Sequence, residues 1–542
     1  MKVNKFFLLI IFLFLFTSAS VAQNNAVSFS SLQKNQLADG FKVTALYLND
    51  ADKPMGGRFI HQATGFTLDL LQIESVPQSF IWVNTFPVSD KGEPHTQEHL
   101  LTTKGNKGHE LNTREGMSLA ESNAFTSQLH TVYNFNTGAG AEVFYMLFEK
   151  YLDALLYPDY TNEEVSREVR NWGITQNADK TLRLEEKGAV YNEMSSSMNN
   201  SYSLLYDSLN RVLYGNNHPL SFNAGGLPSG IRELNAADIL KYHQNNYYLG
   251  NMGAINSLPS GMHLDDVLKR MDKILLDLNA ASPQVVHAPA IMPAFHPAEE
   301  GNISIIGFPT ENAQETGAIF LAYPPRLNLD PEEDLLAANF LAVFAGDASS
   351  NLYKIFVDSK TKQEDFDAQS VYSYIDAKNG EPIYFDLDAV STKNLSKEKA
   401  ALARKLIMDE LKKIASWKDH SPELIAFNKR IINNLASYSR GESKFVNSPP
   451  KFGFRNTGDA WYDQLEELGK INSFKKSVVL KPQFEAINKL IATGNNIWKK
   501  YLAKWNLLTT VPYAFVTKPD PGIAYAGSEP PRPSSVTASA RR

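Results

Sequence analysis

The 542-residue sequence contains no cysteine. This absence excludes disulfide bonds, a thiol nucleophile, a lipid-modified cysteine and a cysteine-ligated metal, so any metal ion must be held by His, Asp or Glu. An excess of positive charge is also lacking, because 53 Lys and Arg stand against 59 Asp and Glu and give a formal net charge of −6. Without a basic stripe, nucleic acid is not an expected partner.

Hydrophobic runs of the length that a membrane helix needs are missing as well. The apolar run from Phe6 to Phe16 covers 11 residues (16 − 6 + 1), which is too short to span a bilayer. With Lys2 and Lys5 before it and small residues at 20–22 after it, the run is typical of a secretory signal peptide over residues 1–22. A signal anchor is the alternative. We therefore expect an exported bacterial protein, periplasmic or secreted, with no stable membrane span after signal removal.

The chain is too long for one hydrophobic core and predicts an α+β fold of two consecutive related units. Residues 27–279 form the first unit and residues 300–517 the second, each expected to be a mostly antiparallel sheet packed by helices. Residues 280–299 contain four prolines and predict a linker. Residues 518–542 are rich in Pro, Ser, Gly and Arg and predict a disordered tail.

Hydrophobic periodicity places the main elements within these two units. In the first unit we expect strands at 42–48, 66–73, 79–86 and 131–136, and an amphipathic helix at 141–156. In the second unit we expect strands at 302–308 and 318–323, and helices at 335–344, 397–414 and 422–436.

The motif that carries chemistry is His95-Thr96-Gln97-Glu98-His99. On a helix, which Glu93 and Pro94 favour, His95 and His99 lie on one face and can share a metal ion. A carboxylate from elsewhere would complete a three-ligand zinc site with an open position for water, and Glu98 would take that water's proton. This order of residues is the inverzincin signature. The alternative is two surface histidines beside a glutamate.

Four downstream glutamates are candidates for the third ligand, namely Glu168, Glu185, Glu186 and Glu193. We expect a helix from Leu182 to Met198, on which a spacing of seven residues would place Glu186 and Glu193 on one face. One of them could then bind the metal while the other orients a histidine. The alternative is an acidic helix that faces solvent.

Four segments resemble, in order, the insulinase/pitrilysin family of zinc metallopeptidases, closest to the presequence-protease branch. They are Pro94-His95-Thr96-Gln97-Glu98-His99-Leu100, Ser122-Asn123-Ala124-Phe125-Thr126-Ser127, Gly188-Ala189-Val190-Tyr191-Asn192-Glu193-Met194 and Gly225-Gly226-Leu227-Pro228, the last followed by Leu234 to Tyr248. The resemblance covers roughly residues 40–517 and includes a weaker match at 349–354.

The resemblance assigns roles to these residues. It implies that His95, His99 and Glu193 bind one zinc ion per chain, that Glu98 is the general base, and that Glu186 is a supporting carboxylate. It also implies that the stretch Asn123, Ala124, Phe125 and Thr126 holds the substrate, since an exposed edge strand can pair with an extended peptide. An ordinary core strand is the alternative for that stretch.

These expectations together describe a zinc-dependent endopeptidase that acts on unfolded oligopeptides. The resemblance implies one half of a clamshell, because full-length members have four related units and this chain matches the first two. The Arg/Tyr pair that the second half supplies has no match here, so either a second chain provides it or the chain is a fragment. One rival is a non-catalytic peptide-binding or assembly subunit. A structural zinc site is another, although closed sites use four protein ligands.

Overall fold

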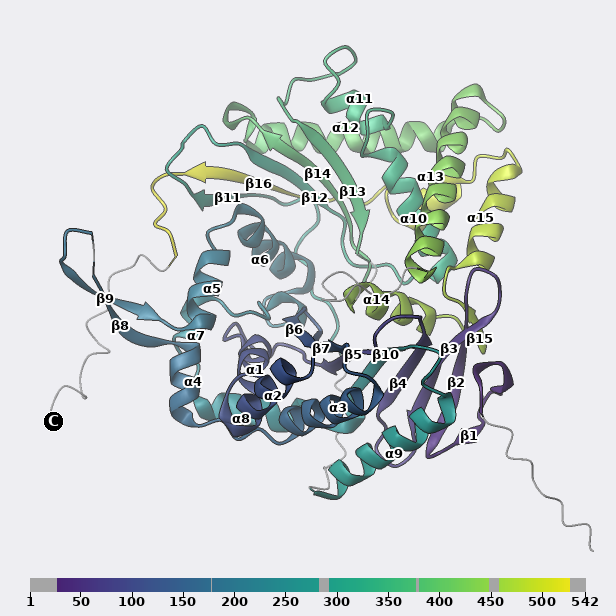
Figure 1. Cartoon of the computed structure of the whole chain (residues 1–542). Coiled ribbons are helices and arrows are strands. Elements are labelled where there is room, and N and C mark those ends of the chain that lie inside the picture. Colours follow the sequence, from purple (N-terminus) through teal and green to yellow (C-terminus); the bar gives the residue numbers. More distant parts are fainter. Residues whose placement is uncertain (1–26, 177, 282–291, 377–379, 448–457, 527–542) are drawn as a thin grey trace, which may run out of the picture.

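The computed structural model describes residues 27–176, 178–281, 292–376, 380–447 and 458–526. The predicted signal segment lies outside the described residues, as do the middle of the predicted linker and the last part of the predicted tail. Two large, mostly antiparallel sheets with their helices make up the described part, and Figure 1 shows one sheet above the other. The predicted α+β class is confirmed.

The first sheet contains nine strands, which are β1 (Leu37–Ala38), β2 (Phe41–Leu48), β3 (Pro54–His61), β4 (Thr67–Gln72), β5 (Gln78–Asn84), β6 (Ala120–Thr126), β7 (His130–Thr137), β10 (Met252–Leu258) and β15 (Lys475–Ser477). Their order is β1-β2-β3-β4-β10-β5-β7-β6, and β15 pairs with β2. Among the described pairs of this sheet, β4–β10 and β2–β15 are parallel and the others antiparallel. Strand β6 is therefore an edge of the sheet.

One face of this sheet is covered by a layer of helices, namely α1 (Glu93–Leu101), α2 (Gly105–Met117), α3 (Ala141–Leu156), α8 (Ala236–Asn246) and α9 (Leu264–Ala281). Helix α3 has the predicted bounds, and it packs on the sheet through an apolar stripe that includes Phe144, Leu147 and Tyr151. Burial of each such side chain contributes about 1.5–3 kcal/mol, so this stripe anchors the layer.

The second sheet contains β11 (Ile303–Pro309), β12 (Gly317–Ala322), β13 (Ser370–Ile375), β14 (Ile383–Val390) and β16 (Tyr513–Asp520), in the order β11-β16-β12-β14-β13. Successive side chains of β12 point to opposite faces and enter different cores. Ile319 and Leu321 lie in the core that includes α10 (Pro331–Phe344) and α12 (Lys397–Ser416). Phe320 and Ala322 pack against α6 (Ser201–Tyr214) instead.

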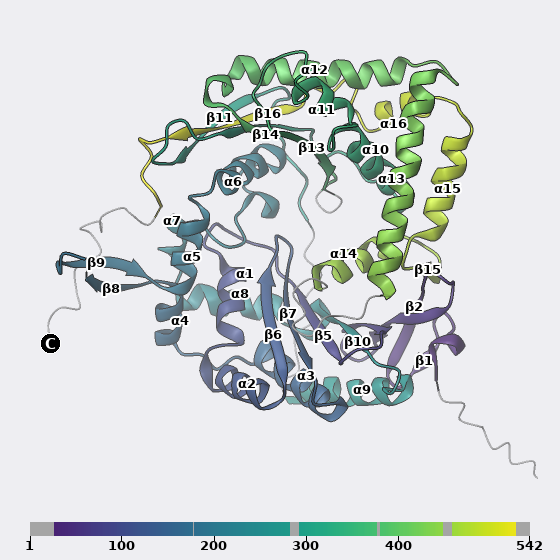
Figure 2. The same cartoon turned by 45° about the horizontal axis from the view of Figure 1, so that its top comes forward.

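Two elements cross the predicted boundary at residues 280–299. Helix α6 comes before it in the chain but packs on the second sheet through Leu209, while β15 comes after it but pairs with the first sheet. Figure 2 shows α6 beneath the second sheet. The inner face of the first sheet, with Phe80 and Val132, belongs to the same buried cluster as the second unit. The two units therefore share a core.

The helix predicted over residues 182–198 is wrong in its first half. Strands β8 (Asn171–Gln176) and β9 (Leu182–Lys187) form a hairpin that projects from the body in Figures 1 and 2, and α5 (Ala189–Ser197) begins after Gly188. Apolar and polar residues alternate in the first residues of β9, which is the period of a strand. The φ angle of Gly188 is 126°, which interrupts any helix at this point.

The remaining helices are α4 (Asn162–Val169), α7 (Pro228–Ile231), α11 (Asn351–Phe356), α13 (Pro422–Asn447), α14 (Gly458–Gly469), α15 (Lys481–Ala492) and α16 (Trp498–Lys504), with 3-10 turns at Phe29–Ser31, Pro219–Ser221, Leu249–Asn251 and Thr392–Asn394. Because β16 continues to Asp520, the first three residues of the predicted tail are in the sheet, paired with β11. Within the described ranges, no helix is both long and apolar enough to cross a membrane.

Candidate metal centre

Helix α1 carries the His-x-x-Glu-His motif, and close backbone packing determines where it begins. Gly92 has a φ of 77°, and a side chain there would come within 2.4 Å of the Gly225 carbonyl oxygen. Pro94 lies in the first turn, where its missing N–H leaves no bond unmade. Glu93 accepts a hydrogen bond from the Ser89 hydroxyl at 2.7 Å. The loop before α1 thus lies directly against the loop that precedes α7.

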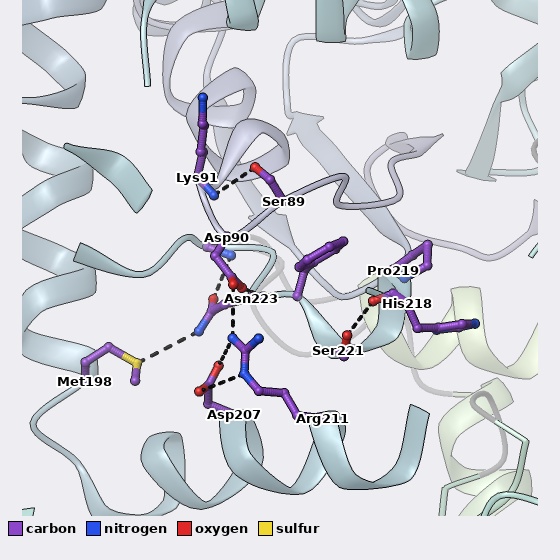
Figure 3. A network of polar contacts seen from close by, with 12 residues as sticks. Ser89, Asp90, Lys91, Met198, Asp207, Arg211, His218, Pro219, Ser221 and Asn223 are labelled. Carbon is purple, nitrogen blue, oxygen red and sulfur yellow. Dashed lines mark hydrogen bonds and ion pairs between the residues drawn. The ribbon is translucent and has the colours of Figure 1, made fainter. Parts of the chain in front are cut away.

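A polar network ties this same loop to α6 (Figure 3). Asp90 accepts hydrogen bonds from Arg211 Nη2 at 3.0 Å and from the backbone N–H of Asn223 at 2.9 Å. Arg211 also pairs with Asp207 at 3.0 Å, and the Asn223 amide contacts the Met198 sulfur at 3.9 Å. These contacts fix the start of α1 relative to the end of α5.

A small apolar cluster packs α1, α4, α5, α7 and α8 together. Its members are all buried, and they are Leu100, Val165, Val169, Val190, Tyr191, Met194, Ile231 and Ile239. The cluster is separate from the main cores of the two sheets. Because it joins helices that are far apart in the sequence, it sets how the polar faces of α1, α4 and α5 meet.

The polar faces meet at His95, His99 and Glu193. The Nε2 atoms of the two histidines lie 3.2 Å apart. His95 Nε2 lies 3.5 Å from Glu193 Oε1, and His99 Nε2 lies 3.5 Å from Glu193 Oε2. In the described part of the chain, no other group of three or more His, Asp or Glu side chains gathers closely enough to share a metal ion. His95 is nearly buried, whereas the Glu193 side chain is 57% exposed, so the group opens to solvent on the side of Glu193.

Glu168 on α4 orients one of the two histidines. Its Oε1 lies 2.9 Å from His99 Nδ1, and its Oε2 accepts an ion pair from Lys104 at 2.8 Å. Burial lowers the pKa of His99, but the bond to Glu168 and the charges of Glu98 and Glu193 outweigh it, and the pKa is raised. A hydrogen bond at Nδ1 leaves Nε2 to act as a metal ligand.

Glu98 lies beside the group without joining it. Its Oε2 accepts a hydrogen bond of 2.6 Å from the Thr126 hydroxyl, at the end of β6. The Thr126 hydroxyl lies 3.3 Å from that of Thr131, which lies 2.9 Å from that of Thr85. Burial raises the pKa of Glu98, although the Thr126 bond and the two histidines lower it. A carboxylate with a raised pKa, held by one hydroxyl, is suited to proton transfer.

The stretch Asn123 to Thr126 lies in β6, on the open edge of the first sheet. Strand β6 pairs antiparallel with β7, and among the described residues it has no partner on its other side. The strand ends at Thr126, next to Glu98, so a peptide added to this edge would run up to the metal-binding group. The geometry is that of an edge strand, as predicted.

Known proteins resemble this chain in both sequence and fold, although no family model matches it. The mitochondrial presequence protease of Gibberella zeae is 28% identical over 284 residues, which are 50% of this chain and 26% of that protein. The presequence protease of Eremothecium gossypii is 30% identical over 223 residues, or 39% of this chain and 21% of that protein. The matched part is thus about a quarter or less of these relatives' length.

Solved structures share the fold at low sequence identity. A peptidase M16 inactive domain from Pseudomonas fluorescens matches with a TM-score of 0.59 and 14% identity over 84% of this chain and 96% of that chain. Pitrilysin matches with a TM-score of 0.57 and 12% identity over 89% of this chain and 47% of that chain. The chain is thus similar in sequence to presequence proteases and in fold to M16 peptidases, among them pitrilysin. The resemblance seen in the sequence motifs is therefore confirmed.

All four segments that resemble the insulinase/pitrilysin family meet around the candidate metal centre. A side chain at Gly225 would come within 2.6 Å of Met194, next to Glu193, and Gly225 also contacts the start of α1. Thr126 reaches Glu98 from the edge strand. These contacts bring the four segments, which are far apart in the sequence, together around the candidate metal centre.

Glu186 does not have the supporting role that the family resemblance implied. It lies on β9, where it pairs with Arg170 at 2.5 Å and Arg232 at 2.8 Å and accepts a hydrogen bond from Tyr191 at 2.6 Å. Burial raises the pKa of Glu186, but these bonds outweigh it and lower the pKa to about 2. The prediction fails because α5 begins after Gly188, so Glu186 and Glu193 share no helix face. Glu168 contacts His99 instead.

The sequence analysis named Glu168 only as a candidate third ligand, not as the partner of His99, and it did not name Lys104, Thr85 or Thr131. The sequence offers one signal for α4, since Thr161 and Glu164 form a capping box that places Glu168 one turn later on the same helix. No local pattern pairs Lys104 with Glu168, or links Thr85 and Thr131 to Thr126, because these contacts join separate elements.

The different roles of Glu168 and Glu186 give a direct test by metal affinity. We expect Glu168→Gln to weaken zinc affinity by about 10- to 100-fold, because the carboxylate that orients His99 is lost. Glu186→Gln serves as the matched control and should bind zinc like the parent protein. Competition with a chromophoric chelator measures both. Equal losses in the two variants would contradict the assignment.

The Glu186→Gln variant should be less stable than the parent protein, although its zinc affinity should be unchanged. Removing a charged hydrogen-bond partner costs about 1.5–3 kcal/mol, and the Glu186 side chain is only 9% exposed. Because the pKa is lowered in the folded state, this stabilisation is present above the unfolded pKa of about 4.3 and is lost as the pH falls towards 2. The free energy of unfolding, measured with denaturant for both proteins, should be lower in the variant at pH 7, and the two values should be closer at pH 3.

Proposed function

We propose that the chain is the metal-binding part of a zinc-dependent endopeptidase that hydrolyses unfolded oligopeptides. One observation carries the proposal, namely the meeting of His95 and His99 with Glu193 while Glu98 stays outside the group, held by the edge strand. Three metal ligands with a free carboxylate beside them are typical of a hydrolytic site. A structural site would use four protein ligands.

The spacing of the ligand atoms fits zinc. Ligand atoms at 2.0–2.1 Å from a tetrahedral ion lie about 3.3–3.4 Å apart, and the Nε2 atoms of His95 and His99 are 3.2 Å apart. Each of them is 3.5 Å from an oxygen of Glu193, His95 from Oε1 and His99 from Oε2, so the carboxylate lies within reach of an ion held by both histidines. A zinc ion in such a site lowers the pKa of water and polarises a carbonyl group. Because the Glu193 side chain is exposed, a substrate could reach an ion held by these three residues.

The residues of the chain supply proton transfer and substrate alignment. Glu98 would take a proton from the attacking water and deliver it to the leaving amine, while the Thr126 hydroxyl holds the carboxylate in place. The free edge of β6 would pair with the peptide backbone, so that extended chains bind and folded proteins do not. Side-chain selectivity should therefore be broad.

A non-catalytic peptide-binding or assembly subunit is the second candidate. The match to a peptidase M16 inactive domain favours it, because this fold does not by itself carry activity. The presence of Glu98 beside the two histidines argues against it, since peptide binding alone requires none of the three.

We also propose that activity requires a second polypeptide of similar fold. This chain matches 47% of the pitrilysin chain, and Glu193 and the edge of β6 face solvent. A second half would exclude water from the bound peptide and supply donors to the developing oxyanion. The predicted signal segment supports an exported, periplasmic or secreted location for such an enzyme.

The proposed reaction is tested by metal content together with peptide cleavage. The parent protein should contain about one zinc per chain, and Glu98→Gln should keep that zinc but lose about 10²–10⁴-fold in turnover of an unstructured peptide. His95→Ala should lose the zinc. His109→Ala is the matched control, because this exposed histidine on α2 is not a member of the group. Parent-like turnover by Glu98→Gln would exclude Glu98 as the base.

The hydrogen bond from Thr126 to Glu98 predicts that its removal shifts the pH dependence of peptide cleavage. This bond lowers the pKa of a buried carboxylate, so Thr126→Val should raise the pKa of Glu98. Since the base must be ionised, the acidic limb of the kcat/KM profile should move to higher pH. Thr126→Ser keeps a hydroxyl and should leave the limb in place. A limb that stays in place in Thr126→Val would contradict the role of this bond.

The requirement for a second half is tested by the mass of the active species. We expect the purified chain to be weakly active alone and to gain activity in a heteromer, because loss of one oxyanion donor typically costs about 10²–10³-fold in turnover. Light scattering during the peptide assay gives the mass. Full zinc-dependent turnover by a species no larger than the 60.5 kDa monomer would show that no second half is needed.

A further inference from the structure

Two large apolar side chains stand exposed at the outer end of the edge strand β6. Met117 ends α2 and is 83% exposed, and Leu119 in the following turn is 69% exposed. Met117 is the most exposed large apolar side chain in the described ranges. In contrast, Glu121, Ser122 and Asn123, the exposed residues of β6, are all polar. The exposed apolar side chains thus lie at the end of β6, whereas the exposed side chains along the strand are polar.

The turn that carries these side chains is held in one conformation. Leu119 has a φ of 45°, a left-handed conformation that Gly or Asn adopts more readily than Leu. The Leu119 carbonyl accepts a hydrogen bond from the Gly138 N–H at 3.1 Å, and that of Ser118 accepts one from the Thr137 hydroxyl at 2.6 Å. An unfavourable backbone conformation that the surroundings enforce is a feature of binding sites.

Strand geometry relates this turn to the metal centre. Thr126 marks the metal end of β6 through its bond to Glu98, and Ala120 marks the other end, six residues away. At about 3.4 Å per residue the two ends are roughly 20 Å apart. A peptide antiparallel to β6 would have its cleaved bond near Thr126 and would reach the turn about seven residues further towards its own C-terminus.

We infer that Met117 and Leu119 form an apolar subsite for a bulky aliphatic or aromatic substrate residue six to eight positions after the cleaved bond. This inference rests on the proposed peptidase function. The occupant is the substrate itself, because the turn continues the edge on which the peptide would lie. The unbranched side chain of Met117 adapts to side chains of different shape. The subsite would favour peptides that are long enough to reach it.

A series of unstructured peptides tests the subsite. Each peptide has one cleavable bond and a single Leu placed three, five, seven or nine residues after it, with Ser at the other test positions. We expect kcat/KM to be highest with Leu at position seven, by roughly 5- to 20-fold over the all-Ser peptide, as expected for partial burial of one apolar side chain. A preference confined to residues before the cleaved bond would overturn the proposed orientation.

Variants connect the preference to the two side chains. Met117→Ser combined with Leu119→Asn, which suits the left-handed backbone, should abolish the preference for Leu at position seven. The same variant should cleave a short peptide, ending three residues after the bond, as fast as the parent protein. Leu37→Ser is the matched control, since Leu37 is 68% exposed on β1 at the opposite edge of the sheet, and it should keep the preference.

The outcomes separate this inference from the proposed function. If the double variant cleaves the short peptide normally and loses the preference, the subsite is supported. If the preference survives, the subsite is wrong while the peptidase function stands. If the parent protein, with any second half it requires, cleaves no peptide, the proposed function fails. A fall in oligomeric mass in the double variant, measured by light scattering, would overturn the subsite and identify the turn as a contact between copies of the chain.

Discussion

The candidate centre depends on the packing of a few apolar side chains between short helices. Leu100, Val190 and Met194 belong to the small cluster that joins α1 to α5, and Val165 adds α4. Each helix has only one apolar face to bury, so burying it fixes the direction in which the opposite, polar face points. His95 and Glu193 thus meet although almost a hundred residues separate them. Without this cluster, the helix that bears the motif would carry two histidines and no third ligand.

The carboxylates around this cluster have different tasks because their surroundings differ. Glu193 is exposed and lies 3.5 Å from the Nε2 atom of each histidine, Glu168 contacts His99 and Lys104, and the half-buried Glu98 accepts a hydrogen bond from one hydroxyl. Glu186 is surrounded by two arginines and holds the base of the β8–β9 hairpin. Burial and neighbouring charge, more than residue type, decide which of these carboxylates can accept a proton and which stays ionised.

The shared core links the two units and leaves one edge of the first sheet open. Helix α6 closes one face of the second sheet while its Arg211 holds the loop before the metal motif. Helix α6 therefore connects the second sheet to the loop that precedes the candidate centre, while the second sheet provides none of the three candidate ligands. Strand β6 remains without a second partner within the described residues, and the turn at its far end is fixed by bonds to β7 and the residue after it. The open edge ends at Thr126, whose hydroxyl donates to Glu98 beside the candidate centre.

The sequence by itself determined the features that depend on local patterns. The period of apolar residues predicted α3 at its observed bounds and the strands β2, β4, β5, β7, β11 and β12, and the spacing of His95, Glu98 and His99 predicted their shared helix. The family resemblance singled out Glu193, which the structure places beside both histidines. These features need only the geometry of a helix or strand, or a motif of a few residues.

Only the tertiary structure decided the features that join distant elements. The spacing of Glu186 and Glu193 suggested one helix, but the backbone turns at Gly188 and separates them. The bond between Glu168 and His99 and the placement of α6 on the second sheet follow from packing between elements, which leaves no periodic trace in the sequence. The sequence thus determines which side chains are available for the chemistry, and the packing of the helices determines which of them meet.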